Sequence, residues 1–257
     1  MSMTGSQLVG RVGAVLRFVG SEGAAGVSTT QVASATGLAR STAQRILAAL
    51  TAEGLIDRDP LRGRWFLGPE MFLLGSVAAN RYDVTAPTRE TIRALAEQTG
   101  ESAHFSARRG EETVCLASAE GSFPLRSHVL HEGIRFPLGV ASAGLAILAH
   151  LPPAESSNYA ARHADEIARR YGEQHGEALL LRRVAATRRR GYAVNPGLVV
   201  PGSWGLGAVV FDSAGSPSWA LSLTGVESRF KGTRTSQLGD LLLEAAHTLT
   251  RRLARRS

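Results

Sequence analysis

The sequence contains a single cysteine, Cys115, among 257 residues. One cysteine cannot form an internal disulfide, and such scarcity is typical of proteins from a reducing compartment. Cys115 lies in the apolar run 113–117, which predicts a buried strand where the thiol packs in the core, lines a pocket or has a redox role. No stretch approaches the roughly 18–20 apolar residues of a membrane helix, and residues 1–11 lack the apolar core of a signal peptide. We therefore expect a cytoplasmic protein with no membrane partner.

Motifs of catalysis and of metal binding are also missing. The chain has no G-x-S-x-G nucleophile motif, no zinc motif and no phosphate-binding loop. His104, His128 and His131 occupy expected strands or turns without the spacing of metal ligands, so we interpret them as ordinary buried or surface side chains. We expect no enzymatic activity, no cofactor and no metal.

The charge balance gives a weaker indication. The chain holds 29 Lys and Arg against 22 Asp and Glu, a net charge of +7, which favours contact with a polyanion. Residues 1–80 nevertheless contain seven arginines against five acidic residues. The position of each charge is therefore more informative than the net charge.

The length suits two modest domains, and 44% hydrophobic and 20% charged residues are ordinary for a globular chain.

The first quarter of the chain has the pattern of a helix-turn-helix. Apolar residues recur at helical spacing between Leu8 and Val19, and a glycine-rich run follows. Ser28 and Gln31 have the spacing of a capping box, which predicts that a second helix begins there. Gly37 then suits the left-handed conformation of a tight turn between two helices.

The third expected helix, 39–53, carries the strongest functional signal. Its inner face is apolar at Ala43, Ile46 and Leu50, whereas its outer face presents hydrogen-bonding groups and no acid. A merely solvated helix usually mixes both charges, whereas a helix that enters the major groove of DNA needs arginine, amide and hydroxyl groups. An ordinary amphipathic helix remains the alternative. The outer-face candidates for DNA contact are Arg40, Ser41, Thr42, Gln44 and Arg45.

A basic hairpin follows this helix. Segments 55–58 and 64–67 have the composition of short strands, and turn residues fill 59–63. The hairpin is typical of the wing of a winged helix-turn-helix, whose arginines reach the DNA backbone or minor groove. We therefore predict a DNA-binding domain over residues 1–68. The remaining candidates for DNA contact are Ser28, Thr29, Arg58, Arg62 and Arg64.

The rest of the chain predicts an α+β domain. Residues 69–85 are expected to form a connecting helix, which is compatible with a local cap on the wing and equally with the dimer contacts that the family resemblance described below implies. Residues 86–257 alternate short strands and helices, as in an antiparallel sheet covered by helices. The expected strands are 102–107, 113–118, 126–129, 192–195, 207–211 and 218–224, and the expected helices are 86–98, 142–150, 154–171, 177–190 and 233–252. The arginine-rich runs in 182–190 and 251–256 are interpreted as solvated faces, with auxiliary DNA contact as the alternative.

Several ordered motifs resemble those of the IclR (isocitrate lyase regulator) family of transcription regulators. The resemblance extends over more than 200 residues, and chance does not easily produce so many motifs in order. It departs from the family pattern at Gly139, Leu145 and Asn195, where the family usually has His, Lys and an acidic loop. The matching segments are 36–47 (TGLARSTAQRIL), 54–56 (GLI), 65–68 (WFLG), 95–104 (LAEQTGESAH), 133–138 (GIRFPL), 143–149 (AGLAILA), 190–193 (RGYA) and 222–225 (SLTG).

The resemblance implies a GAF-like sheet with a pocket for a small effector in residues 86–257. Ser222 and Thr224 share one face of their strand and could orient an oxygen of the effector, although ordinary strand hydroxyls are the alternative. Asn195 and Trp204 suggest a less charged, more aromatic pocket, and an aromatic or hydroxylated acid as effector. The pocket candidates are Ser142 and Ala143 at a helix start, Asn195, Trp204 and Gly205 in a loop, and Ser222 and Thr224 on a strand.

We therefore predict a regulator that binds double-stranded DNA as a homodimer, or as a dimer of dimers, on a palindromic operator. A small organic effector, a carboxylate or an aromatic acid, is expected to modulate that binding, and a repressor is favoured over an activator. Two alternatives are an enzyme with a protein-binding winged helix and a winged helix that makes protein contacts only. The first requires an activated nucleophile or a carboxylate pair in the second domain. The second requires that Arg40 and Arg45 be dispensable.

Overall fold

A computed structural model describes residues 5–81 and 85–255. The chain divides into two compact units, Met1–Asp83 and Val84–Ser257. The boundary falls within the segment 69–85 that was expected to connect two domains. Within the described residues, no helix combines the length and the hydrophobicity needed to cross a bilayer.

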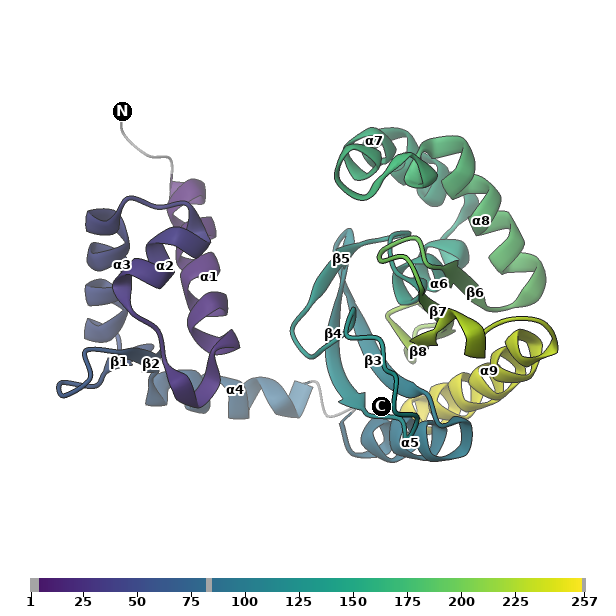
Figure 1. Cartoon of the computed structure of the whole chain (residues 1–257), viewed down its shortest axis with the longest axis horizontal. Coiled ribbons are helices and arrows are strands. Elements are labelled where there is room, and N and C mark those ends of the chain that lie inside the picture. Colours follow the sequence, from purple (N-terminus) through teal and green to yellow (C-terminus); the bar gives the residue numbers. More distant parts are fainter. Residues whose placement is uncertain (1–4, 82–84, 256–257) are drawn as a thin grey trace. The chain divides into compact units, whose positions relative to one another are not determined.

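The first unit is a helical domain with a small hairpin (Figure 1). The α2 helix begins with the expected capping box, in which Ser28 Oγ accepts from the amide of Gln31 and the Gln31 side chain accepts from the amide of Ser28. Gly37 ends α2 in the left-handed conformation, at φ 65°. The elements are α1 (Gly5–Ser21), η1 (Gly23–Ala25), α2 (Thr29–Thr36), α3 (Arg40–Ala52), β1 (Ile56–Arg58), β2 (Trp65–Leu67) and α4 (Pro69–Arg81).

One apolar core holds this unit together. Val15 from α1, Leu47 from α3 and Trp65 from β2 are all buried in it. The apolar spacing of each helix therefore places its inner face here, and the polar face of α3 is turned outward. The winged helix-turn-helix expected from the sequence is confirmed.

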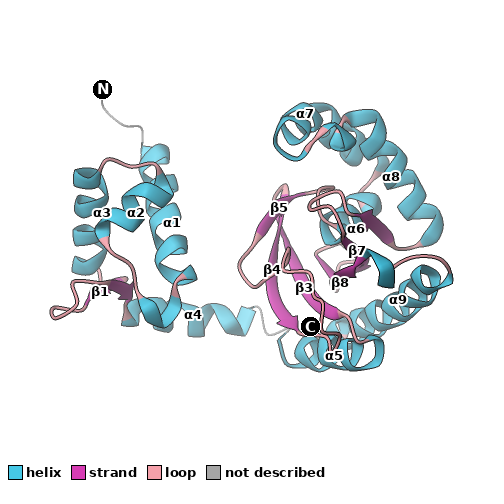
Figure 2. Ribbon diagram, viewed as in Figure 1, coloured by secondary structure: helices cyan, strands magenta, loops and turns pink. Residues whose placement is uncertain are grey.

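The second unit is an antiparallel sheet of six strands, in the order β5-β4-β3-β8-β7-β6. Helices α5 and α9 cover one face, and α6, with α7 and α8 outside it, covers the other (Figure 2). The elements are α5 (Thr85–Thr99), β3 (Ser102–Arg109), β4 (Glu112–Ala119), β5 (Arg135–Pro137), α6 (Ser142–His150), α7 (Pro153–Tyr171), η2 (Glu173–His175), α8 (Glu177–Arg190), β6 (Ala193–Pro196), β7 (Ser203–Val210), β8 (Trp219–Val226), η3 (Glu227–Arg229) and α9 (Thr233–Ala254). This confirms the expected α+β fold.

Strand alternation divides the side chains between two cores. Leu206 and Leu223 face α5 and α9, whereas Val209 and Ala220 face α6. Every residue of α6 from Ser142 to Ala149 is buried, because the helix lies between the sheet and α8. A helix buried all round needs small or apolar residues on every face, as the segment AGLAILA supplies.

Three details of the strand prediction were wrong. Residues 126–129 are irregular, and β5 at 135–137 takes the place beside β4 instead. The β7 strand begins at Ser203 rather than at residue 207. Gly205 therefore lies in a strand rather than in a loop, and its register partner Asn195 lies in β6, in agreement with the expected strand 192–195. The cause is backbone pairing over long sequence separations, which local alternation of side chains does not reveal.

Candidate DNA-binding surface and ligand pocket

The outer face of α3 presents the predicted DNA-reading side chains. Arg40, Ser41, Gln44 and Arg45 are exposed and Thr42 is half-buried. Helix α3 contains no acidic residue, so no negative charge on this helix would repel a phosphate backbone. Such a face supplies donors for guanine and phosphate and an amide for adenine.

Two predicted contact residues are already engaged within the unit. The hydroxyl of Ser28 caps α2. Thr29 Oγ1 accepts from Trp65 Nε1 at 3.0 Å and donates to Gln44 Oε1 at 3.1 Å. Thr29 therefore links the wing strand to α3 and fixes the orientation of the Gln44 amide, which is a positioning role.

The three wing arginines differ in their surroundings. Arg64 Nη1 donates to the carbonyl of Gly26 at 2.9 Å, and the Arg58 guanidinium lies 5.2 Å from the centre of the Trp65 ring. Arg62 is exposed at the tip of the wing. The Asp59 carboxylate shapes that tip, because it accepts from the amides of Leu61 and Arg62, and these bonds lower its pKa. Sequence reasoning did not single out Asp59, although an Asp that begins a turn of this kind is a recognisable signal.

The arginine run of α8 makes contacts inside its own unit. Arg188 donates to the carbonyls of Ala149 and Leu151, near the end of α6, and to Ser156 Oγ. Arg183 donates to the carbonyl of Gly139 at 3.1 Å, and burial lowers its pKa to about 10. Both side chains therefore support the fold around α6.

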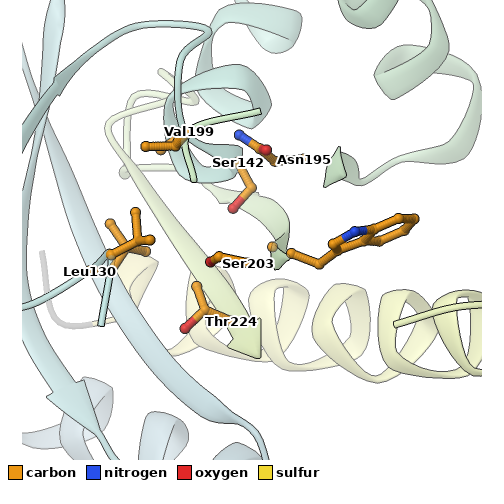
Figure 3. A pocket seen from close by; sticks show the side chains of 10 residues that line it. Leu130, Ser142, Asn195, Val199, Ser203 and Thr224 are labelled. Carbon is orange, nitrogen blue, oxygen red and sulfur yellow. The ribbon is translucent and has the colours of Figure 1, made fainter. Parts of the chain in front are cut away.

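A small pocket lies between the start of α6 and the sheet. Figure 3 shows Leu130, Ser142, Asn195 and Thr224 arranged around it. The volume open to the centre of a water molecule is about 20 Å³, which is room for little more than one water. Among the described residues, those that line the pocket carry no formal charge: Val129, Leu130, Ala141, Ser142, Asn195, Val199, Ser203, Trp204, Gly205 and Thr224.

Hydrogen bonds fasten the walls of this pocket. Asn195 Nδ2 donates to the carbonyl of Val140 at 2.7 Å, and its Oδ1 accepts from the amide of Leu198 at 2.9 Å. Ser142 Oγ donates to the carbonyl of Leu206 at 3.2 Å. The side chains of Ser127 and Ser203 meet at 2.5 Å and join the segment after β4 to β7.

Glycines on β7 allow α6 to approach the sheet. A Cβ on Gly207 would lie 2.4 Å from the carbonyl oxygen of Ser142, and one on Gly205 would lie 3.0 Å from Ser142 Oγ. The cap residue Ala141 supplies no side-chain hydrogen bond to the first turn of α6, and Ala141 and Ser142 both line the pocket.

Five of the seven predicted pocket residues line the pocket in the structure: Ser142, Asn195, Trp204, Gly205 and Thr224. Ala143 and Ser222 are buried nearby but do not line the space. Trp204 borders it, but its side chain packs against the α5 and α9 core. The indole is therefore on the opposite face of the sheet, and the aromatic character expected from it is not directed into the pocket.

Cys115 and His104 are two further buried groups that can ionise. Burial raises the pKa of the Cys115 thiol to about 12, so Cys115 packs as a neutral side chain in the core. His104 lies beside the pocket, with Nε2 3.1 Å from Thr224 Oγ1, and was not among the predicted pocket residues. The hydrophobic alternation of its strand could have placed it on this face. No group of His, Cys and acidic side chains in the described ranges could hold a metal ion.

A winged helix with an acid-free recognition helix defines a DNA-binding transcription regulator. Two family models match the chain: "IclR helix-turn-helix domain" over residues 8–60 and "Bacterial transcriptional regulator IclR C-terminal" over residues 76–251. The chain belongs to the IclR family of bacterial transcriptional regulators, in agreement with the resemblance found in its motifs. Proteins of this family are regulators and not enzymes.

Individual proteins show the same similarity along the whole chain. The HTH-type transcriptional regulator BhcR of Paracoccus denitrificans is 30% identical over 88% of this chain and 80% of its own length. The transcriptional repressor IclR of Escherichia coli is 26% identical over 87% of this chain and 82% of its own. An IclR homolog from Microbacterium hydrocarbonoxydans, solved in complex with 4-hydroxybenzoate, covers 97% of this chain and 99% of its own at 21% identity, with a TM-score of 0.73.

Proposed function

We propose that this regulator binds a palindromic operator as a homodimer and that a small organic acid in the α6 pocket changes its affinity for that operator. The observation that carries the proposal is the pairing of an acid-free recognition helix with a pocket built at a free helix N-terminus. If the acid and the operator favour different arrangements of the protein, each changes the affinity for the other.

The DNA-contact proposal rests on exposure. Arg40, Gln44 and Arg45 are exposed on α3, and Arg62 is exposed at the wing tip. Arginine donors suit guanine, and the amide of Gln44 suits adenine. One recognition helix reads only a few base pairs, so two copies on paired half-sites supply the specificity.

An apolar stripe on α4 supports the dimer. Phe72, Leu73, Leu74 and Val77 are between 53% and 75% exposed, which does not agree with the alternative that α4 merely caps the wing. A contiguous exposed apolar surface of this kind marks a contact with another molecule. We propose a second copy of the chain as that partner, with a dimer of dimers as the larger assembly.

The pocket favours an acid of modest size. Free amides at the start of α6 suit a carboxylate, and the hydroxyl and amide groups of Ser142, Asn195 and Thr224 suit further polar groups. The homolog with bound 4-hydroxybenzoate supports an aromatic or hydroxylated acid as the effector class. The space of about 20 Å³ is too small for such an acid, so binding requires a wall of the pocket to move. We expect this displacement of the pocket wall to be the change by which an effector alters the affinity of the protein for its operator.

Repression is favoured because the Escherichia coli relative is named a repressor, with activation as the alternative. We expect the protein to act in the cytoplasm, where its operator is.

The test selects, from a pool of randomised duplex DNA, the sequences that the purified protein binds at two salt concentrations. Arg45→Ala is compared with Arg93→Ala, which removes the same charge from an exposed position on α5. We expect a palindrome that the wild type and Arg93→Ala enrich and Arg45→Ala does not, with weaker binding at higher salt. Equal behaviour of all three proteins would reject the major-groove role and favour protein contacts instead.

A further inference from the structure

The tip of the wing carries an apolar side chain that the fold does not use. Leu61, in the turn between β1 and β2, is 95% exposed, the highest value among the large apolar side chains of the described residues. It is not part of the apolar core that holds the first unit together. A leucine in water adds nothing to the stability of the unit, so any contribution from Leu61 must come from contact with another molecule.

The backbone of the tip holds Leu61 in place. The Asp59 carboxylate accepts from the amides of Leu61 and Arg62 at 2.8 and 3.1 Å. The Asp59 carbonyl accepts from the amide of Gly63 at 2.9 Å, and Gly63 supplies the left-handed conformation that closes the turn, at φ 64°. Pro60 restricts its own φ angle. A tip constrained in this way cannot easily fold Leu61 back onto the protein, so the side chain is presented before a partner arrives.

The hairpin is anchored to the helix that we propose to enter the major groove. Trp65 on β2 donates to Thr29 Oγ1, which in turn donates to Gln44 on α3. Strand β1 also packs against α3. Because a minor groove lies on each side of any stretch of major groove, a tip fixed beside this helix is placed to reach the adjacent minor groove.

The charges around Leu61 suit DNA. The hairpin from Ile56 to Leu67 carries three arginines and two aspartates, and the Asp59 carboxylate is engaged inside the turn. Arg62, the next residue after Leu61, is exposed. The negative potential of a narrow minor groove attracts arginine side chains. An apolar protein surface would instead bury Arg62 together with Leu61, which is costly for an unpaired charge.

We propose that Leu61 enters the minor groove beside each half-site and disfavours guanine there. This rests on the proposed operator binding and deepens it, because it adds a base preference outside the major-groove contact. In the minor groove an A·T pair presents only acceptors, whereas a G·C pair adds a donor, the 2-amino group of guanine. Leucine has no acceptor. A leucine packed over that amino group would leave the donor without a hydrogen bond, which weakens binding to G·C.

Operators that differ in one minor-groove group test the proposal. The probe is the palindrome selected by the full chain, with the three base pairs of the minor groove on each side of each half-site set to A·T, G·C or I·C. Inosine is guanine without its 2-amino group, so I·C has the major groove of G·C and the minor-groove groups of A·T. We expect fluorescence anisotropy to show that the wild type binds the A·T and I·C operators about equally, and about tenfold more tightly than the G·C operator.

A variant and a matched control assign the preference to one side chain. Leu61→Ser should lower the preference for I·C over G·C to about threefold or less, because a serine hydroxyl can accept from the amino group. Leu125→Ser removes a leucine that is 65% exposed in the irregular segment between β4 and β5, and it should keep the full preference. The melting temperature of Leu61→Ser should equal that of the wild type, because Leu61 lies outside the core.

Three results would overturn the role of Leu61 and leave the major-groove proposal standing. They are equal wild-type affinity for the three operators, an I·C operator bound as weakly as the G·C operator, and a preference that Leu61→Ser retains in full. A selection in which the wild type enriches no palindrome would overturn operator binding and the role of Leu61 together.

Discussion

Thr29 Oγ1 on α2 donates to Gln44 Oε1 on α3 at 3.1 Å and so holds the amide of a side chain that we propose to read DNA. The same hydroxyl accepts from the indole of Trp65, so one side chain connects α2, α3 and the wing. This arrangement orients the recognition surface before DNA arrives, and preorganisation of that kind favours affinity.

Thr29→Val should therefore weaken both stability and DNA binding. The substitution leaves the buried Trp65 Nε1 without an acceptor, which costs about 1–3 kcal/mol. It also frees Gln44, so affinity for a selected operator should fall. Urea unfolding and fluorescence anisotropy with labelled duplex measure the two effects. Thr30→Val, at the next and exposed position, is the control and should change neither; an unaltered Thr29→Val protein would contradict the linking role.

Glu101→Gln should destabilise the second unit. The Glu101 side chain is 1% exposed and accepts from Arg229 Nε at 2.5 Å and from Arg234 Nη2 at 3.1 Å. Removing its charge leaves two guanidinium groups poorly paired, a loss of about 3 kcal/mol. Thermal unfolding followed by calorimetry measures it. Glu90→Gln breaks the exposed pair with Arg252 and should cost less than about 1 kcal/mol, so equal effects of the two variants would refute the distinction.

Stability should fall as the pH is lowered from 6.5 to 4. The pKa of His104 is about 4 in the folded chain, against an ordinary value of 6.5, because burial disfavours the cation. The unfolded state therefore binds a proton that the folded state does not, and stability is full above pH 6.5 and lost below it, by up to about 3 kcal/mol. Burial lowers the pKa of His175 as well, so it adds to the same trend.

Denaturant unfolding between pH 4 and pH 7.5 measures this dependence. His104→Gln should show a shallower slope than the wild type, because the contribution of His104 is removed while that of His175 remains. His128→Gln, at an exposed position in the irregular segment 126–129, is the control and should keep the full slope. Identical slopes in wild type and His104→Gln would contradict a neutral, buried His104.

The sequence predicted most helices well, and α6 and α8 begin and end at the predicted residues. Their bounds depend on local features, namely apolar spacing and glycine at the end of α8. The sequence was less informative about which residues lie beside one another in the sheet and which face each side chain takes. Trp204 faces away from the pocket because it lies on the same face of β7 as Leu206, two residues on, and Leu206 belongs to the α5 and α9 core.

The sequence could not predict which buried polar side chains are neighbours in the sheet, for the same reason. The neighbouring positions of His104 and Ser222 arise from the pairing of β3 with β8, 118 positions further along the chain. No local pattern reports such a register. The resemblance to a family indicated where the pocket lies, but not which buried polar groups lack partners within it.

The most direct test of the account is the affinity of the purified protein for its selected palindrome, measured with and without a series of aromatic and hydroxylated acids. The account predicts that at least one acid, with 4-hydroxybenzoate the first to try, changes the affinity at least fivefold. Repression predicts a decrease and activation an increase. An operator affinity that none of these acids changes would contradict the central claim that the α6 pocket controls DNA binding.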